Sequence, residues 1–183
     1  MTTLTPASLF ARLDGMIEWA KNEKTAIAPR STGPLDILPA ASFWREGEPH
    51  AVIYCREPEH GDDLTALLSA GILHFHPESV CVVMEGESRG RGTCALGFAS
   101  DGRTVVVARA FYSTVGNIPV FGKTERSPLA VSEFHPFSDG LIAPFDLRSS
   151  GVAGDVETLA RALKQHTVEE VSTGLIFGPY RAG

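Results

Sequence analysis

The pattern of apolar and polar positions predicts a helix near the start of the chain, at about residues 6–22. Thr5 followed by Pro6 is a typical helix start, because threonine caps free N–H groups and proline suits the first helical position. Such a helix is marginal alone in water, so its apolar stripe must be buried against a sheet or a partner. The stripe recurs at helical spacing and consists of Leu9, Phe10, Leu13, Met16, Ile17 and Ala20.

Apolar runs farther along the chain predict strands. A run at 51–55 is typical of a buried strand, and three more runs follow Pro77. The dipeptide Asp101-Gly102 lies between the last two runs and is a strong short-range signal for a hairpin. We therefore expect an antiparallel β-meander at about 79–112. Its strands fall at 80–85, 93–99 and 104–112.

Two more helices are predicted, at about 62–73 and at about 155–165. Asp62 or Asp63 can cap the first of them, and Asp155 can cap the second. The sequence thus predicts an α+β fold. It consists of one domain, residues 1–183, in which a mainly antiparallel sheet packs against the N-terminal helix, the second helix and the C-terminal helix.

Two long segments, 23–50 and 113–154, carry several prolines and little periodic pattern, so we expect them to be irregular. A short strand fits the second segment at either 118–121 or 129–134. Irregular segments of this length in a compact domain are usually functional, or they contain strands that the pattern does not reveal.

Composition limits the classes of partner. The chain has 183 residues, a hydrophobic content of 43% and a formal net charge of −6. General binding to nucleic acid by charge alone is therefore not expected. The basic residues around Arg89-Gly90-Arg91, together with Lys123 and Arg126, are interpreted as solvated loop charges.

Glu85 and Glu87 share one strand face and are expected to pair with an arginine of the following hairpin, Arg103 or Arg109.

The sequence also bears on the compartment. No apolar run approaches the roughly 20 residues that cross a bilayer, and the first residues do not have the basic and apolar regions of a secretory signal. The three cysteines, Cys55, Cys81 and Cys94, form no C-x-x-C pair and lie in apolar runs. We expect a soluble cytoplasmic protein with free, buried thiols and no membrane partner.

Common catalytic motifs are missing from the sequence, which has no phosphate-binding G-x-x-x-x-G-K-[ST] loop and no G-x-S-x-G nucleophile elbow. One pair of residues could bind a metal. His74 and His76 would point the same way if the backbone between them were extended, and Glu87 follows eleven residues later. These three residues are candidate ligands for a zinc ion.

The spacing of His74, His76 and Glu87 resembles the metal motif of the JAB/MPN family of zinc isopeptidases. That motif has His-x-His, seven residues, serine, two residues and aspartate. Met84 stands at the serine position of the motif, and Glu87 stands at the aspartate position. The resemblance implies a zinc-dependent hydrolase whose general base is an upstream glutamate. Glu46, Glu48 and Glu57 are available for that role.

Two main functions follow from these observations. The first is a non-enzymatic binding or assembly protein that acts through surface loops on a protein partner or as a homo-oligomer, without a cofactor. Accessory proteins of viruses and mobile elements have this style of sequence. The alternative is the zinc hydrolase built on His74, His76 and a carboxylate. A weaker interpretation is a small-molecule sensor with an aromatic pocket between the first helix and the meander, lined by Trp19, Trp44, Phe75 and Tyr112.

Overall fold

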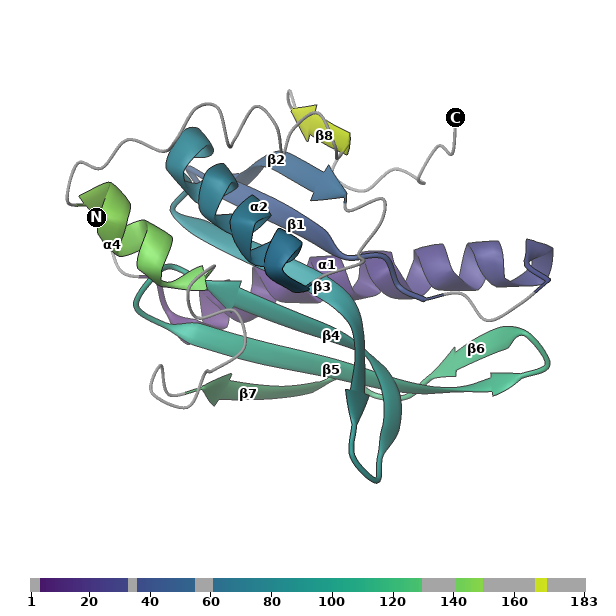
Figure 1. Cartoon of the computed structure of the whole chain (residues 1–183). Helices are drawn as coiled ribbons and strands as arrows, with labels where there is room; N and C mark the ends of the chain where they lie inside the picture. Colours follow the sequence, from purple (N-terminus) through teal and green to yellow (C-terminus); the bar gives the residue numbers. More distant parts are fainter. Residues whose placement is uncertain (1–3, 33–35, 55–60, 130–140, 150–166, 171–183) are drawn as a thin grey trace.

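The computed structural model describes residues 4–32, 36–54, 61–129, 141–149 and 167–170. Its helices and strands are connected mostly by short turns (Figure 1). In chain order they are α1 (Pro6–Ile27), the short 3-10 helix η1 (Ala28–Arg30), β1 (Ala40–Arg45), β2 (Glu48–Tyr54), α2 (Gly61–Phe75), β3 (Ser79–Ser88), β4 (Gly92–Ser100), β5 (Val105–Val115), β6 (Ile118–Phe121), β7 (Glu125–Leu129), α4 (Ala143–Ser149) and β8 (Thr167–Glu170).

One antiparallel sheet organises the domain. Its strand order is β6-β5-β4-β3-β1-β2-β8, and β7 also pairs with β5. α1 lies behind the sheet in the view of Figure 1, and α2 and α4 lie in front of it. The predicted α+β fold with its β3–β5 meander is therefore confirmed. None of the helices in the described ranges combines the length and apolar character that crossing a membrane requires.

The first face of the sheet is covered by α1. The Thr5 hydroxyl accepts a hydrogen bond from the Ser8 N–H at 3.2 Å, which caps the helix start as predicted. The sheet residues beneath α1 are small, which lets the helix approach the strands closely. At Gly97, an added Cβ would lie 2.8 Å from Leu13 Cδ1 and 3.0 Å from Ile17 Cδ1. The small residues include Ala40, Ala95, Ala99, Ala108 and Ala110, all buried with α1 in one cluster.

α1 is longer than predicted and ends at Ile27 rather than near residue 22. The apolar stripe of the sequence stops at Ala20, so hydrophobic periodicity gave no reason to extend the helix. In the structure Lys24 takes the next sheet-facing position, and its side chain is buried against a carboxylate of the sheet. A charged residue thus occupies a core-facing position because it has a partner there.

The second face of the sheet is covered by α2 and α4. The predicted helix at 62–73 is confirmed, with bounds of Gly61–Phe75. The predicted helix at 155–165 lies outside the described residues. α4 was not predicted, and it packs beside α2. The core on this face is bulkier and contains Phe43, Ile53, Leu68, Ile72, Val80, Val82, Phe98, Val105, Val107, Leu141 and Phe145.

The expectation that 23–50 is irregular was wrong for much of the segment. It contains β1 and the start of β2, which are connected by Glu46 and Gly47 with φ values of 55° and 85°. Pro49 obscured the second strand in the sequence. The structure accommodates this proline opposite Trp44, where the register of β1 and β2 shifts at a bulge.

The expectation for 113–154 was also wrong in part. β5 continues to Val115, and the predicted short strand at 118–121 is confirmed as β6. Of the alternative strand at 129–134, Leu129 belongs to β7, and residues 130–134 lie outside the described ranges. β6 and β7 both pair with β5, and the register changes by one residue between them. This change marks a bulge at 122–124, where the Gly122 N–H donates to the Phe111 carbonyl at 2.8 Å.

Candidate functional site

The end of β5 and all of β6 form a two-stranded ribbon, residues 112–121, at one edge of the sheet (Figure 1). The two strands are joined by the two-residue loop Gly116-Asn117. Gly116 has a φ of 63°, which is the conformation that the first central position of a type II′ turn requires. The turn matches the right-handed twist of the strands and fixes their register.

The ribbon has two different faces, because side chains alternate along each strand and directly paired residues share a face. Tyr112 with Phe121, and Thr114 with Pro119, form the inner face toward α1. The opposite face, called the open face below, consists of Ser113, Val115, Ile118 and Val120.

The open face exposes three aliphatic side chains. Val115 is 70% exposed, Ile118 49% and Val120 52%. These are three of the five large hydrophobic residues that are exposed in the described part of the chain. Single exposed apolar residues are ordinary on protein surfaces, and a contiguous group on one ribbon is a candidate interaction site.

The inner face of the ribbon is held against α1 by aromatic contacts. The rings of Tyr112 and Phe121 lie 4.9 Å apart, and Pro119 is buried. The Lys24 ammonium lies 4.4 Å from the centre of the Tyr112 ring, and the Lys21 ammonium lies 5.9 Å from that of Phe121. These cation–π contacts attach the ribbon to the last turns of the helix.

A polar cluster lies at the root of the ribbon. The Glu85 carboxylate of β3 receives three hydrogen bonds on Oε2: from Lys24 Nζ at 2.6 Å, from the Tyr112 hydroxyl at 2.8 Å and from the Ile37 N–H at 3.0 Å. In return, the Glu85 N–H donates to the Ile37 carbonyl at 3.2 Å. The Lys24 side chain is only 8% exposed and that of Glu85 is 21% exposed. The cluster therefore connects α1, the segment before β1, β3 and β5.

The environment changes the acidity of these groups. Burial opposes ionisation of Glu85, but hydrogen bonds from Lys24, Tyr112 and the Ile37 N–H outweigh it, so the pKa of Glu85 lies below its ordinary value. Burial and the hydrogen bond to Glu85 raise the pKa of Tyr112, which stays protonated as a donor. Partial burial and the Glu85 charge raise the pKa of the neighbouring Asp36.

These properties suit a structural anchor better than a catalytic group. The single oxygen Oε2 is already engaged by three donors, and the ammonium of Lys24 is fixed between a carboxylate and an aromatic ring. Nor does the sheet offer an activated thiol at its centre, because burial raises the pKa of Cys81 to about 12.

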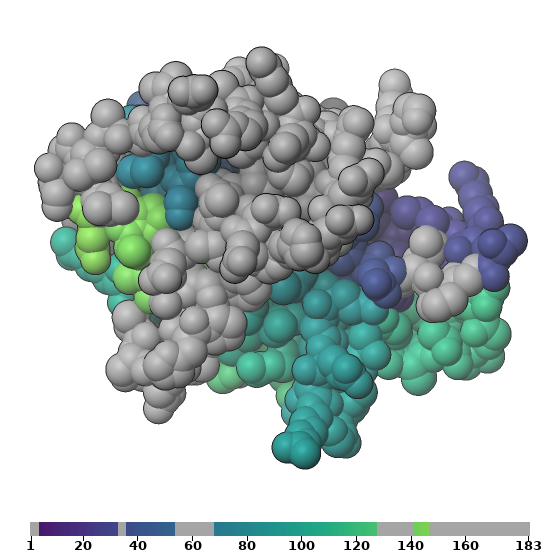
Figure 2. All heavy atoms as spheres, viewed as in Figure 1, coloured from purple at the N-terminus to yellow at the C-terminus, as the bar shows by residue number. Residues whose placement is uncertain are grey.

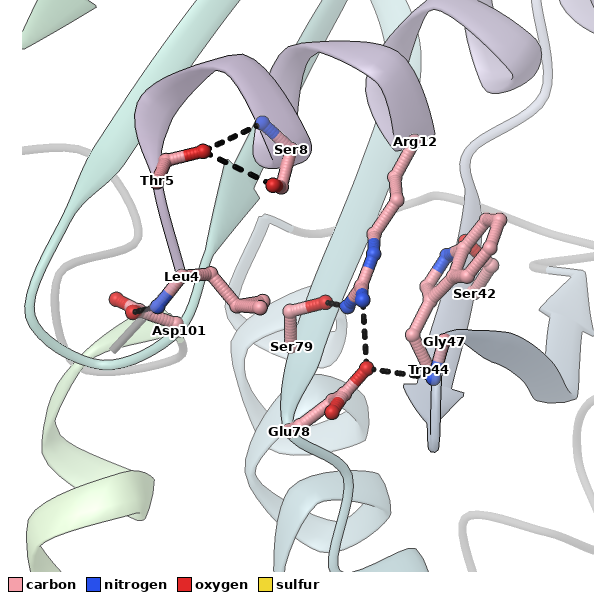
Figure 3. A network of polar contacts seen from close by, with 10 residues as sticks. All are labelled: Leu4, Thr5, Ser8, Arg12, Ser42, Trp44, Gly47, Glu78, Ser79 and Asp101. Atoms are coloured by element: carbon pink, nitrogen blue, oxygen red, sulfur yellow. Dashed lines mark hydrogen bonds and ion pairs between the residues drawn. The ribbon is translucent and has the colours of Figure 1, made fainter. Parts of the chain in front are cut away.

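A second polar cluster fixes the other end of α1 (Figure 3). Arg12, whose side chain is 10% exposed, donates to Ser79 Oγ and, at 2.6 Å, to Glu78 Oε1. Glu78 Oε1 also accepts from the Gly47 N–H at 2.9 Å. The Arg12 guanidinium lies 5.1 Å from the centre of the Trp44 ring. This cluster joins α1 to the β1–β2 turn and the start of β3.

The predicted zinc ligands do not come together in the described structure. His74 lies within α2 and His76 has a φ of 50°, so the extended backbone that would align the two imidazoles is not found. Glu87 lies near the far end of β3, eight residues beyond Ser79, which corresponds to roughly 26 Å along a strand. No group of three or more His, Cys, Asp or Glu side chains is placed to hold a metal ion within the described ranges.

The predicted charge pairs are rearranged in the structure. The cationic partner of Glu85 is Lys24, from a helix turn that the sequence pattern did not include. Arg91 of the basic turn binds Glu125 with two hydrogen bonds, at 2.6 and 2.9 Å. Arg126 binds Asp14 of α1 in the same two-bond manner, at 2.7 and 2.9 Å. Arg91 and Arg126 are thus engaged within the protein.

The ribbon itself was missed as a candidate site. Its signal in the sequence is the dipeptide Gly116-Asn117 between Val115 and the apolar run 118–121, which is typical of a hairpin with a type II′ turn. Pro119 weakened that signal, because proline is uncommon inside a sheet.

Comparison of the chain with protein-family models, curated proteins and solved structures gives no match.

Replacing Lys24 by methionine tests the anchoring role of the cluster. The change leaves the Glu85 carboxylate half-buried without its cation, and we expect it to cost about 1–3 kcal/mol of unfolding free energy. Because the pKa of Glu85 is lowered in the folded protein, the contribution of the pair is present above pH 4.5, the ordinary value. It is lost as the pH falls through the lower folded-state value. Urea unfolding of both proteins across this pH range measures the difference.

Glu18→Gln is the control, since Glu18 forms an ion pair with Lys21 through a carboxylate side chain that is 58% exposed. Its cost should stay below about 0.5 kcal/mol. Equal losses for the two variants, or a pH-independent loss for Lys24→Met, would show that the cluster does not anchor the helix.

Replacing His76 by glycine separates a structural role from a metal-binding role. His76 has a left-handed backbone directly after α2, so glycine should stabilise the protein by up to about 1 kcal/mol. Thermal unfolding with and without a chelator, together with zinc analysis of untagged protein, checks this. The expectation would be contradicted if the natural protein held one zinc ion per chain and the variant had lost both the zinc and part of its melting temperature.

Proposed function

We propose that this protein acts by binding another polypeptide through the open face of the β5–β6 ribbon. The observation that carries the proposal is the exposure of Val115, Ile118 and Val120 on one face of a ribbon whose other face is fastened to α1. Keeping three aliphatic side chains in water is costly for a solitary molecule, and that cost is recovered when a partner covers them.

The fixed root of the ribbon favours binding. A flexible hairpin would lose conformational entropy on association, whereas this ribbon is already held by Lys24, Glu85 and Tyr112. In the space-filling view, the ribbon projects at one side of the molecule (Figure 2). A partner therefore meets a preorganised surface.

The partner is expected to contact side chains rather than to add a strand to the edge of β6. Val115 and Ile118 flank a two-residue loop, so their backbones form a hydrogen-bonded pair. Because these backbone groups alternate in direction along a strand, those of the next residue, Pro119, point away from β5, toward the outer edge of β6. Proline has no N–H to offer there, which blocks pairing with another strand.

The size of the patch defines the class of interaction. The three exposed aliphatic side chains present on the order of 300 Å², which is the lower end of the range for the largest apolar patch on a monomeric protein. A stable interface between two folded proteins buries about 800 Å² on each partner. The open face therefore suits a short segment of a partner or a transient contact. Nothing in the positions of His74, His76 and Glu87 favours the alternative of a zinc hydrolase.

Site-specific photocrosslinking tests this function, and the ribbon supplies its own matched control. Ser113 and Thr114 are adjacent, polar and exposed, but Ser113 lies on the open face and Thr114 on the inner face. A benzophenone amino acid at 113 should yield a discrete adduct in cells that make the protein naturally, and Ile118→Asp should remove that adduct. The same group at 114 should yield none. Identical adducts from both positions, or none from position 113, would refute the proposal.

A further inference from the structure

The open face continues along β5 beyond the ribbon. Arg109 and Phe111 lie on the same face as Ser113 and Val115, because they follow one another at intervals of two residues. From Arg109 to Val115 the strip is about 20 Å long, at about 3.3 Å per residue. It therefore has an aliphatic end on the ribbon and an aromatic, charged end over the central part of β5.

Among the residues that the structure describes, the charged end of the strip has more cations than anions. Arg91, from the turn between β3 and β4, lies with its guanidinium 4.1 Å from the centre of the Phe111 ring and binds Glu125 of β7. Arg109 is the direct cross-strand partner of Glu125. The hydrogen bonds from Arg91, followed by the charges of Arg91 and Arg109, hold the pKa of Glu125 below its usual range. Two guanidinium groups thus share one carboxylate.

Arg109 is the group left with capacity to bind. Both oxygens of Glu125 accept from Arg91, and within the described ranges the Arg109 side chain makes no hydrogen bond. The Arg109 side chain is only partly exposed. It lies between its cross-strand partners, the partly buried Leu96 of β4 and Glu125 at the start of β7. A guanidinium in this position binds a carboxylate well, because its planar N–H groups match the two oxygens.

Resting on the proposed function, we infer that the segment bound by the open face is an aliphatic peptide that carries a carboxylate toward one end. Its aliphatic side chains cover Val115, Ile118 and Val120, and its Asp or Glu side chain, or a terminal carboxylate, binds Arg109 beside the Arg91–Phe111 pair. The spacing between the two contacts matches about six residues of extended peptide.

Two other occupants fit the same surface less well. A second copy that docked through the same strip would bring a second excess of positive charge, and the one carboxylate described on that strip, Glu125, is already bound by Arg91. The exposed apolar area is also well below what a stable dimer of folded proteins needs. An anionic bilayer would extend beyond the basic strip and meet the rest of the acidic molecule, with its net charge of −6, whereas a short peptide meets only the strip.

Selection from a displayed library of random twelve-residue peptides tests the inference directly. Peptides enriched on the natural protein should share aliphatic residues followed or preceded by Asp or Glu. A selected peptide, labelled with a fluorophore, should bind Arg109→Glu at least about tenfold more weakly, because a charge pair is replaced by repulsion. Changing the peptide's acid to lysine should restore binding to Arg109→Glu. Arg45→Glu makes the same charge change at the exposed end of β1 and should leave the affinity unchanged.

The possible results separate this inference from the proposed function. If the enriched peptides lacked an acidic residue and still failed to bind Val120→Asp, the inferred carboxylate contact with Arg109 would be overturned. The proposed binding function would be left standing. A dimer in light scattering that Val120→Asp dissociates, with no peptide enriched, would assign the face to a second copy. If the protein floated with vesicles of phosphatidylcholine and phosphatidylserine and bound no library peptide, both the inferred peptide and the proposed polypeptide-binding function would be overturned. Peptides that bind Val120→Asp unchanged would refute the open face itself.

Discussion

Lys24 and Glu85 form an ion pair at the point where α1, the segment before β1, and strands β3 and β5 meet. Removing two charges from water is costly, and the pair is stable because Glu85 receives three donors and Lys24 also contacts the Tyr112 ring. The pair fixes the last turns of α1 and thereby the inner face of the ribbon. If the pair were absent, the ribbon would still be joined to the sheet through β5, but only its aromatic contacts and the hydrogen bond from Asn117 Nδ2 to the Ser31 carbonyl would hold it against the helical side.

This arrangement separates the part of the ribbon that is stabilised from the part that is exposed. The inner face is packed by Tyr112, Pro119 and Phe121, while the open face keeps Val115 and Ile118 in solvent. Pro119 serves both purposes, because its ring is buried and its missing N–H protects the edge of β6. The result is an apolar surface that is held in place on one side and whose edge resists the addition of another strand.

The sequence predicted the elements whose signals are local, and it missed those that depend on partners distant in the chain. The capped start of α1 at Thr5 and the meander around Asp101-Gly102 carry short-range signals, so they were predictable. The last turn of α1 was not, because Lys24 appears polar until Glu85, 61 residues away, is placed beside it. The local His-x-His pattern also made His74 and His76 candidate zinc ligands. In the structure His74 belongs to α2, so the backbone between the two residues is not extended.

Amide hydrogen exchange of the ribbon measures its dependence on the ion pair most directly. In the natural protein, the hydrogen-bonded amides of residues 112–121 should be protected from exchange. In Lys24→Met, their protection should fall selectively, while the β3–β4 pairing near Val82 and Phe98 stays protected. Unchanged protection of the ribbon in the variant, or an equal loss across the whole sheet, would contradict the conclusion that this pair holds the ribbon and its open face in place.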